Sequence, residues 1–591
     1  MNSRYRGLLR SLRPWRNLIC LALLPAATAA VAQVPQPITR AEDLLVTSNA
    51  PGKYGGRIAV ALRAEPKSLN PVTSLDQPSR EVIGRMMADL LHINAVSQQA
   101  ESALAKSWRV SKDGLLYTLT LRRGLRFSDG QPMNADDVLF TFQVLLDEKI
   151  NSPQRDLLTI GGKPISVRRV DDVTVVFELA RPYAAAERLF DSMEILPRHL
   201  LQDSYRQGDL ARAWSLTTPP EQIAGMGPFR LKEYVPGQKL VLERNPYYWK
   251  VDRNHQRLPY LDELVFLFVP SEDAQVLRFE AGETDVIQRL SADNYSALEK
   301  DAASRSFRLF DLGPSLDYNF LLFNLNSSVP KEAADIARHQ DWFRNANFRQ
   351  AVSAGVDRDA IVRLVYHSRG TALWSSVTPA NKLWLDASLP HPARSVERAK
   401  QLLRDGGFSW NAAGTLVDKS GTPVEFSILT SASSAQRGQM ATLIQDDLRQ
   451  LGMKVQAVPL EFKSMLDRVF QTHNYDTAIM GLGGGDIDPN SQINVWMSNG
   501  GSHLWNLGRS TPATDWEAQI DTLMNQQLST LDYKRRKQLY NRVQEIAAQQ
   551  LPFIDLASPN VLVGAKERVG NFQPAILDHY TLWNVEQLYI K

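Results

Sequence analysis

The sequence predicts a mixed α/β protein with at least two packed lobes. Its 591 residues exceed the usual size of one domain. Hydrophobic residues make up 43% and charged residues 22%, which is typical of a globular chain. Residues 424–460 contain a strand–helix–strand pattern typical of a parallel sheet, and no repeat of the solenoid kind is present.

The N-terminus has the pattern of a secretory signal peptide. An apolar run, Leu18 to Ala32, ends in the small-x-small sequence "AVA" and predicts cleavage after Ala32. The run is shorter than the roughly 20 residues of a spanning helix, and "NLI" before Cys20 is unlike a lipid-attachment box. We therefore expect a periplasmic protein that is not lipid-anchored. The basic region before this run contains Arg4, Arg6, Arg10, Arg13 and Arg16.

Loss of these five arginines changes the formal charge from 67 − 64 = +3 to 62 − 64 = −2. The predicted mature chain thus has no excess of basic residues to meet phosphates, and nucleic acid is not an expected partner. Cys20 is the only cysteine and leaves with the leader. The mature protein must therefore rely on its core for stability, without disulfides.

The first half of the chain begins with a polar, proline-punctuated segment and continues with β-rich patterns. Residues 33–54 predict a mobile leader. Asn134 is expected to cap a helix that follows a turn at residues 128–130, with Asp136 and Asp137 in its first turn. Strands are predicted at 55–63, from Leu115 and at 171–179, and a hairpin at 227–249 around Pro236-Gly237.

The second half alternates strands and helices more regularly. Strands are predicted at 315–326, 424–431, 453–460 and 551–558, and helices at 345–356, 357–367, 395–408, 435–452 and 532–550. Asp357 is the expected N-cap of one helix, and Gly406-Gly407 ends another.

No sequence motif of a common enzyme class is present. The nine histidines are scattered without metal-binding spacing, and the G-x-S-x-G and Walker motifs are absent. Residues 486–497 begin like a calcium loop, but Ser491 and Met497 replace its essential glycine and glutamate. We expect no catalysis, cofactor or metal. A periplasmic hydrolase stays an alternative because catalytic triads assemble in space.

Several motifs resemble the family 5 solute-binding proteins of ABC importers, which include periplasmic oligopeptide and dipeptide binders. "LRRGLRFSDGQPMNADDVLFTF", residues 121–142, resembles the family signature, with Asn134 replacing its usual Thr. The matching residues are Arg126, Phe127, Ser128, Asp129, Gly130, Pro132, Ala135, Asp137 and Val138. Further resemblances, in the family's order, lie at 65–71, 225–249, 280–286 and 348–362.

The resemblance implies a two-lobe periplasmic binding protein fold of class II (cluster C), with a two-strand hinge and an extra subdomain inserted in lobe I. It implies a monomer that captures peptides between the lobes and delivers them to an inner-membrane ABC permease with its ATPase subunits. The expected segments are 1–32 signal peptide; 33–54 leader; 55–75, 186–308 and 556–591 lobe I; 76–185 inserted subdomain; and 309–555 lobe II.

The loop within residues 475–496 is the leading candidate for cargo contact. A strand ends in glycines, and two acids, Asp486 and Asp488, precede Pro489. In peptide-binding relatives, an Asp of the corresponding loop receives the α-amino group, and Asp486 looks like that residue. The family usually has three residues between this Asp and the Pro, but here there are two, so Asp488 is an equal candidate. A turn in which both acids bond their own backbone is one alternative, and oligosaccharide cargo is another.

Six other residues are predicted to contact cargo. Three tryptophans in loop-like contexts of lobe II could form aromatic walls, although a core position is an alternative for each. Arg437 opens a helix and could bind a peptide carboxylate, or else be solvated. Two further residues begin the strand after the hinge. The six are Trp374, Trp496, Trp505, Arg437, Tyr318 and Asn319.

Overall fold

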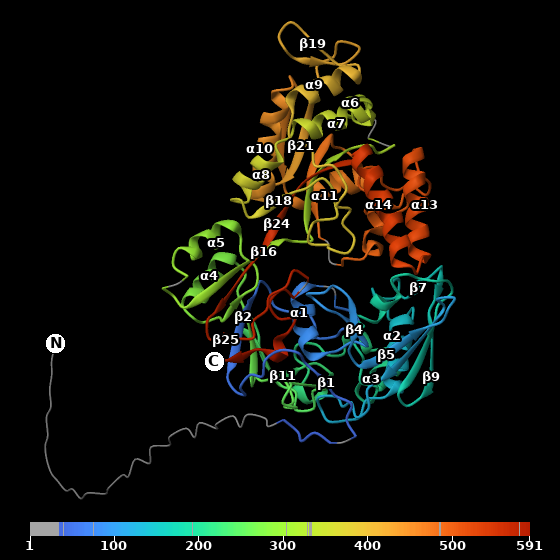
Figure 1. Ribbon diagram of the computed structural model, residues 1–591, viewed down its shortest axis with the longest axis vertical. Helices are drawn as coiled ribbons and strands as arrows, with labels where there is room; N and C mark the ends of the chain where they lie inside the picture. The colour runs from blue at the N-terminus through green and yellow to red at the C-terminus, as the bar shows by residue number, and fades with distance from the viewer. Residues whose placement is uncertain are drawn as a thin grey trace, which may run out of the picture.

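The computed structural model describes residues 35–39, 41–74, 76–191, 193–302, 304–327, 329, 334–483, 486–577 and 579–591. The chain forms two lobes, with lobe I below and lobe II above in Figure 1. Each lobe has a central β-sheet with helices packed on it, so the predicted α/β class is confirmed. The predicted signal peptide, residues 1–32, lies outside the described residues.

Lobe I is built on a sheet that joins strands from both ends of the chain. Its strands are β11 (Phe229–Val235), β12 (Lys239–Arg244), β14 (Glu263–Phe268), β2 (Arg57–Leu62), β15 (Val286–Ile287), β24 (Phe553–Lys566) and β16 (Phe307–Pro314). β2 is almost wholly apolar because it is central and covered on both faces. The predicted hairpin is confirmed as β11 and β12. This lobe also contains α1 (Gln77–Met86), α4 (Glu272–Glu280), α5 (Ala292–Glu299), β25 (Val569–Gly570) and β26 (Tyr589–Ile590).

A subdomain between β2 and the rest of lobe I contains a four-stranded antiparallel sheet. Its order is β5 (Ala105–Val110), β6 (Leu116–Leu121), β10 (Thr174–Glu178) and β9 (Ser166–Asp171). Asn134 caps α2 (Ala135–Leu146): its side chain accepts from Asp136 N at 2.8 Å, and its own N–H donates to Asp137 at 3.0 Å. The predicted cap is thus confirmed. Also present are β3 (Leu91–Ile93), β4 (Ala100–Ser102), β7 (Thr159–Ile160), β8 (Lys163–Pro164), η1 (Ala186–Phe190) and α3 (Arg198–Gln207).

Lobe II is a sheet sandwiched between two groups of helices. From β24 the order is β17 (Tyr318–Phe323), β23 (Thr477–Leu482), β21 (Glu425–Ser431) and β22 (Lys454–Leu460). β21 and β22 are parallel and joined by α10 (Ala435–Arg449), so the predicted strand–helix–strand unit is confirmed. One face is covered by α7 (Ala346–Gly355), α8 (Arg358–Val365), α9 (Val396–Asp405) and α10. The other is covered by α11 (Phe462–Asp467), α13 (Asp515–Ser529) and α14 (Tyr533–Gln550).

The period-2 alternation of β17 explains the two cores of lobe II. Phe320 and Leu322 point into the core that α13 and α14 cover, whereas Leu321 and Phe323 point into the opposite core. The remaining elements of this lobe are α6 (Ala334–Arg344), α12 (Ile493–Trp496), β18 (Gly370–Ala372), β19 (Ser409–Trp410) and β20 (Leu416–Val417).

Two chain segments cross between the lobes side by side. β24 pairs with β17 in lobe II at its start and with β16 in lobe I at its end. The connection from β16 to β17 runs beside it, and Ser315 N donates to Pro559 O at 2.8 Å. This pair of crossing segments is the predicted two-strand hinge, and the two-lobe class is confirmed.

The leader predicted to be mobile has partners on lobe I. β1 (Leu45–Val46) forms a short parallel pair with β13 (Lys250–Val251). Arg257, which is buried, donates to the Glu42 carboxylate at 2.7 Å. Polar composition alone gives no sign of these contacts, because backbone pairing does not depend on apolar side chains.

Candidate ligand-binding site at the lobe interface

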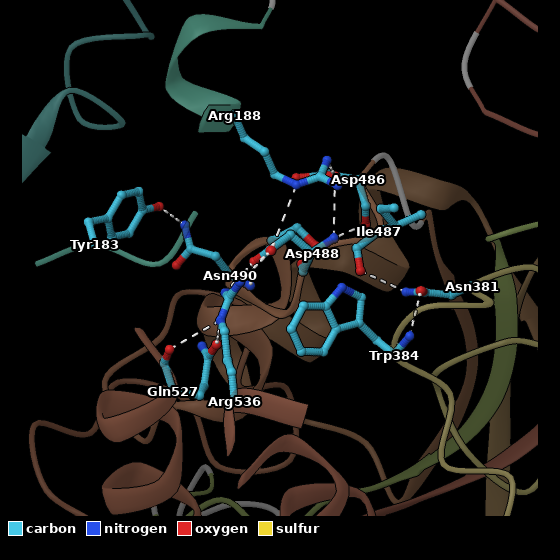
Figure 2. A network of polar contacts seen from close by, with 11 residues as sticks. Tyr183, Arg188, Asn381, Trp384, Asp486, Ile487, Asp488, Asn490, Gln527 and Arg536 are labelled. Carbon is cyan, nitrogen blue, oxygen red and sulfur yellow. Dashed lines mark hydrogen bonds and ion pairs between the residues drawn. The ribbon is translucent and has the colours of Figure 1, made fainter. Parts of the chain in front are cut away.

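The acidic loop of lobe II lies against lobe I. It follows β23, which is central in its sheet, and leads into the short turn η5 (Pro489–Gln492). Gly484 and Gly485 lie outside the described residues. Figure 2 shows Asp486 and Asp488 beside Arg188, which comes from η1 of lobe I. The sequence-predicted loop is thus placed where the lobes meet.

Asp488 is held mainly by an arginine of its own lobe. Arg536 of α14 donates to both carboxylate oxygens, at 2.7 and 2.6 Å, and both side chains are 5% exposed. Asp488 Oδ1 also accepts from Asn490 N at 2.9 Å, capping η5. A bidentate guanidinium satisfies a buried carboxylate, so this acid anchors the loop.

Several contacts fix the guanidinium of Arg536 in turn. Its Nε donates to Gln527 Oε1 at 2.9 Å and to the Gln527 carbonyl at 3.1 Å. Its guanidinium carbon lies 4.8 Å from the centre of the Trp384 ring. Figure 2 labels both residues. The Arg536–Asp488 pair is therefore part of the packed structure of lobe II. The Asp488 carboxylate has little capacity left to bind an external cation.

Asp486 is paired across the interface instead. Arg188 Nη1 donates to its carboxylate, and Arg188 Nε lies 3.7 Å from Asp488. The Asp486 side chain keeps 36% of its surface exposed. Partial burial between the lobes raises its pKa to about 6, Arg188 lowers the pKa, and Asp488 raises it further. Asp486 is thus a carboxylate whose charge depends on a cation supplied from lobe I.

Further contacts around this loop join the two lobes. The Asn490 amide donates to the Tyr183 hydroxyl, and Ala184 N donates to the carbonyl of Leu528 at 2.7 Å. Gln98 Nε2 donates to Ala380 O at 2.9 Å. The Leu528 side chain, although part of α13, packs into the core of lobe I. The structure therefore shows the lobes in contact along the inserted subdomain.

Two of the other predicted residues form a second polar group within lobe II, and a third contacts the end of the acidic loop. Arg437 Nε donates to Asn319 Oδ1 at 3.1 Å, and Asn319 Nδ2 donates to Tyr366 at 2.9 Å. The hydroxyl of Tyr318 reaches Gln492 at 3.3 Å, at the end of the acidic loop. Tyr318 is otherwise 1% exposed and belongs to the core. Arg437 is half-buried, and burial lowers its pKa.

The three predicted tryptophans lie in or beside the core of lobe II. Trp505 is 1% exposed, and its Nε1 donates to Glu517 at 2.9 Å. Trp496 packs on Trp505 with ring centres 5.9 Å apart. Trp374 stacks on His391 at 4.5 Å. Among the described residues, none of the three indole N–H groups bonds to Asp486 or Asp488. The positions of Trp496 and Trp505 are those of core residues.

Trp374 and Trp496 line a cavity with room for about one water molecule, under α14. Asp555 of β24 also lines it and is 8% exposed, and its Oδ1 has no hydrogen-bond partner among the described residues. Burial raises the pKa of Asp555 to about 7, against a lowering by Arg358. The neutral acid is thus favoured in the folded protein at mildly acidic pH.

We expect Asp555→Asn to change how stability depends on pH. The folded-state pKa of about 7 lies above the ordinary value of 3.8. The protonated acid therefore contributes its full stabilisation below pH 3.8, and this stabilisation is lost as pH rises to about 7. Urea unfolding of both proteins should show that wild type loses about 1–3 kcal/mol relative to the variant between pH 5 and pH 8. The exposed Asp359→Asn is the control, and parallel curves for wild type and Asp555→Asn would contradict the assignment.

Sequence reasoning missed the arginines that partner the loop acids. Arg188 is 298 residues from Asp486, and Arg536 is 48 residues from Asp488. In the sequence, Arg188 follows Glu187 in the otherwise apolar run "AAAERLF", and charged residues there are typical of solvated positions. The one available signal was that paired acids at a buried turn need cations from elsewhere in the fold.

Comparison with known proteins defines the class of this two-lobed structure. The model of the bacterial extracellular solute-binding proteins, family 5, matches residues 99–503. The chain therefore belongs to this family of ABC transporter binding proteins. Among the described residues, no helix is both long and apolar enough to cross a membrane.

Individual relatives cover most of the chain. A probable ABC transporter-binding protein of Deinococcus radiodurans is 29% identical, over 88% of this chain and 90% of its own length. The oligopeptide-binding protein AppA of Bacillus subtilis is 24% identical, over 91% and 92%. The crystal structure of the ABC transporter substrate-binding protein CtaP from Listeria monocytogenes has a TM-score of 0.74 at 23% identity, covering 91% of this chain and all of that one.

Proposed function

We propose that this protein is a periplasmic receptor that binds peptides between its lobes and delivers them to an ABC permease. The observation that carries the proposal is the placement of Asp486. It is the acid of the loop that faces lobe I, its side chain remains partly exposed, and its partner is a cation. The similarity to an oligopeptide-binding relative supports a peptide cargo. Membership of a family of solute-binding proteins supports a protein that binds its cargo and catalyses no reaction on it.

The Arg188 guanidinium occupies the position that a peptide ammonium would take. Both groups are cations that donate hydrogen bonds to a carboxylate, so the peptide's α-amino group competes with Arg188 for Asp486. A cargo favours the closed arrangement only through contacts with both lobes. In this proposal, the Arg188–Asp486 contact is lost when cargo binds, and the cargo makes its own contacts with lobe I and lobe II.

The proposed location follows from the leader. Residues 1–32 act as a signal peptide, and the mature chain begins at Gln33 in the periplasm, where it meets its permease. N-terminal sequencing of the protein recovered from a periplasmic extract should begin at Gln33. An intact N-terminus on a membrane-bound protein would overturn this location.

Mass spectrometry of small molecules released from the purified protein tests the cargo class. Peptides recovered intact would support a receptor, whereas cleavage products with turnover would indicate a hydrolase. Thermal-shift screening adds a second measurement, because a ligand that binds only the native state raises the melting temperature. Stabilisation by oligosaccharides and not by peptides would overturn the peptide assignment.

Asp486→Asn is expected to weaken binding of a free-amine peptide by about 1.5–3 kcal/mol, the usual contribution of a charged hydrogen bond. The affinity for an N-acetylated peptide should be the same in the variant and in wild type, because this peptide has no ammonium group. Arg188→Gln should strengthen binding of the free-amine peptide a few-fold by removing its competitor, since a partly exposed ion pair contributes about 0–1 kcal/mol. Calorimetry measures both, with the exposed Asp405→Asn as control. Unchanged affinity in Asp486→Asn would remove this acid from the site.

A further inference from the structure

A cluster of potential metal ligands lies in the inserted subdomain, outside the site described above. Asp89 precedes β3, His92 lies within β3, and Asp191 directly follows η1. Asp191 Oδ1 accepts from the backbone N–H of Ile93 at 3.1 Å, which ties the end of η1 to β3. β3 pairs with β4, which Figure 1 shows in the part of lobe I that faces lobe II. The three side chains thus come from two elements that are fixed to each other.

The three groups are close enough together to contact one ion. His92 Nδ1 lies 3.6 Å from Asp89 Oδ2 and 3.5 Å from Asp191 Oδ1, and all three ligand atoms lie within 4.8 Å of one another. Good N–H···O hydrogen bonds are shorter, at about 2.7–3.2 Å. Tetrahedral zinc with bonds of about 2.0–2.2 Å separates its ligand atoms by about 3.3–3.6 Å. The two His92–Asp distances therefore fit zinc ligands, whereas without an ion they are ion pairs.

The surroundings favour a cation that can enter from solvent. The side chains of His92, Asp89 and Asp191 are 39%, 19% and 23% exposed. Two carboxylates thus face one imidazole. Arg188, on η1, is a cation close to Asp191, but its guanidinium is directed to Asp486.

We propose that Asp89, His92 and Asp191 bind one zinc-class divalent cation and leave a fourth coordination position to water or to a donor atom of the cargo. One imidazole nitrogen with two carboxylate oxygens suits zinc, whereas calcium takes six to eight oxygens and magnesium keeps an octahedral shell of water. The ion would lie beside Arg188 and so next to the lobe interface. This site goes beyond peptide binding and does not depend on it.

Zinc titration of the mature chain, residues 33–591, with any purification tag removed and after treatment with a chelator, tests the site. Calorimetry with zinc chloride and no peptide should show one saturable site. His92→Ala and Asp191→Asn should each weaken it at least about a hundredfold, because each removes a direct ligand. Cobalt(II) supplies a second readout, since its visible spectrum reports tetrahedral coordination and should be lost in the same variants.

His199→Ala is the matched control. His199 Nε2 contacts one carboxylate, Asp129, at the hydrogen-bond distance of 2.6 Å, and its side chain is 32% exposed. This variant should bind zinc as wild type does. Asp89→Asn is a further ligand variant, for use if His92→Ala unfolds by circular dichroism. Unchanged zinc affinity in the ligand variants, or no saturable binding to wild type, would show that the cluster is an ion-paired histidine only. Failure of peptide binding would leave these zinc results unaffected.

Discussion

Arg536→Met is expected to lower the free energy of unfolding by about 3–5 kcal/mol, the usual effect of removing one partner from a buried ion pair. Methionine keeps much of the side-chain volume next to Trp384 but donates no hydrogen bond. The Asp488 carboxylate, which is 5% exposed, would then keep its burial without its counterion. Gln527 would lose the donor to its side-chain oxygen as well.

Urea denaturation of wild type and variants measures this effect. Arg535→Met, one residue earlier on α14 and exposed, is the matched control and should change stability by no more than about 0.5 kcal/mol. Adding Asp488→Asn to Arg536→Met should recover part of the loss, because the uncompensated charge is then removed. Equal stabilities of the Arg535 and Arg536 variants would show that the pair contributes nothing to the fold.

Trp505→Ala is expected to destabilise the protein by about 3–5 kcal/mol, as is usual for a large aromatic side chain removed from a core. The ring is 1% exposed and packs against Trp496 and Phe553, with ring centres 5.9 and 5.8 Å away. Its Nε1–H is also a donor to the buried Glu517. Trp505→Phe keeps most of the packing and should lose only about 1–2 kcal/mol, chiefly for that hydrogen bond.

The same variants separate a core role from a cargo-contact role. Well below the melting temperature, Trp505→Phe should bind peptide with wild-type affinity, because this ring lies in the core of lobe II and its indole N–H bonds to Glu517. A variant of normal stability that has lost affinity would instead place the ring at the cargo. Melting curves and calorimetry on one protein preparation provide both measurements.

Local patterns predicted the elements of the fold well because each depends on neighbouring residues. The cap at Asn134 and the unit of β21, α10 and β22 follow from periodicity and from side chains only a few residues apart. The strand predicted at 551–558 is extended in the structure to Lys566, since β24 continues from lobe II into lobe I. The apolar run Val561 to Val563 is a local strand signal, but it does not show that the same strand passes into the other lobe.

The candidate site was only partly predictable, because it depends on pairings across the fold. The acidic loop is visible in the sequence, but the arginines that partner Asp486 and Asp488 come from η1 and α14. Trp505 lies in a glycine-rich context that suggests exposure, yet Glu517 from the following helix satisfies its indole. A sequence shows which groups need partners and seldom which residues supply them.

The return of the last strands to lobe I sets the order in which the protein can fold. β2, near residue 60, has β15 and β14 as neighbours, but the sheet of lobe I is not complete until β24 adds residues 560–566. The sheet of lobe II spans less of the chain, from β17 at residue 318 to the first part of β24, residues 553–557. Contacts so distant in sequence form slowly. During synthesis, the sheet of lobe I therefore stays incomplete until almost the whole chain has been made.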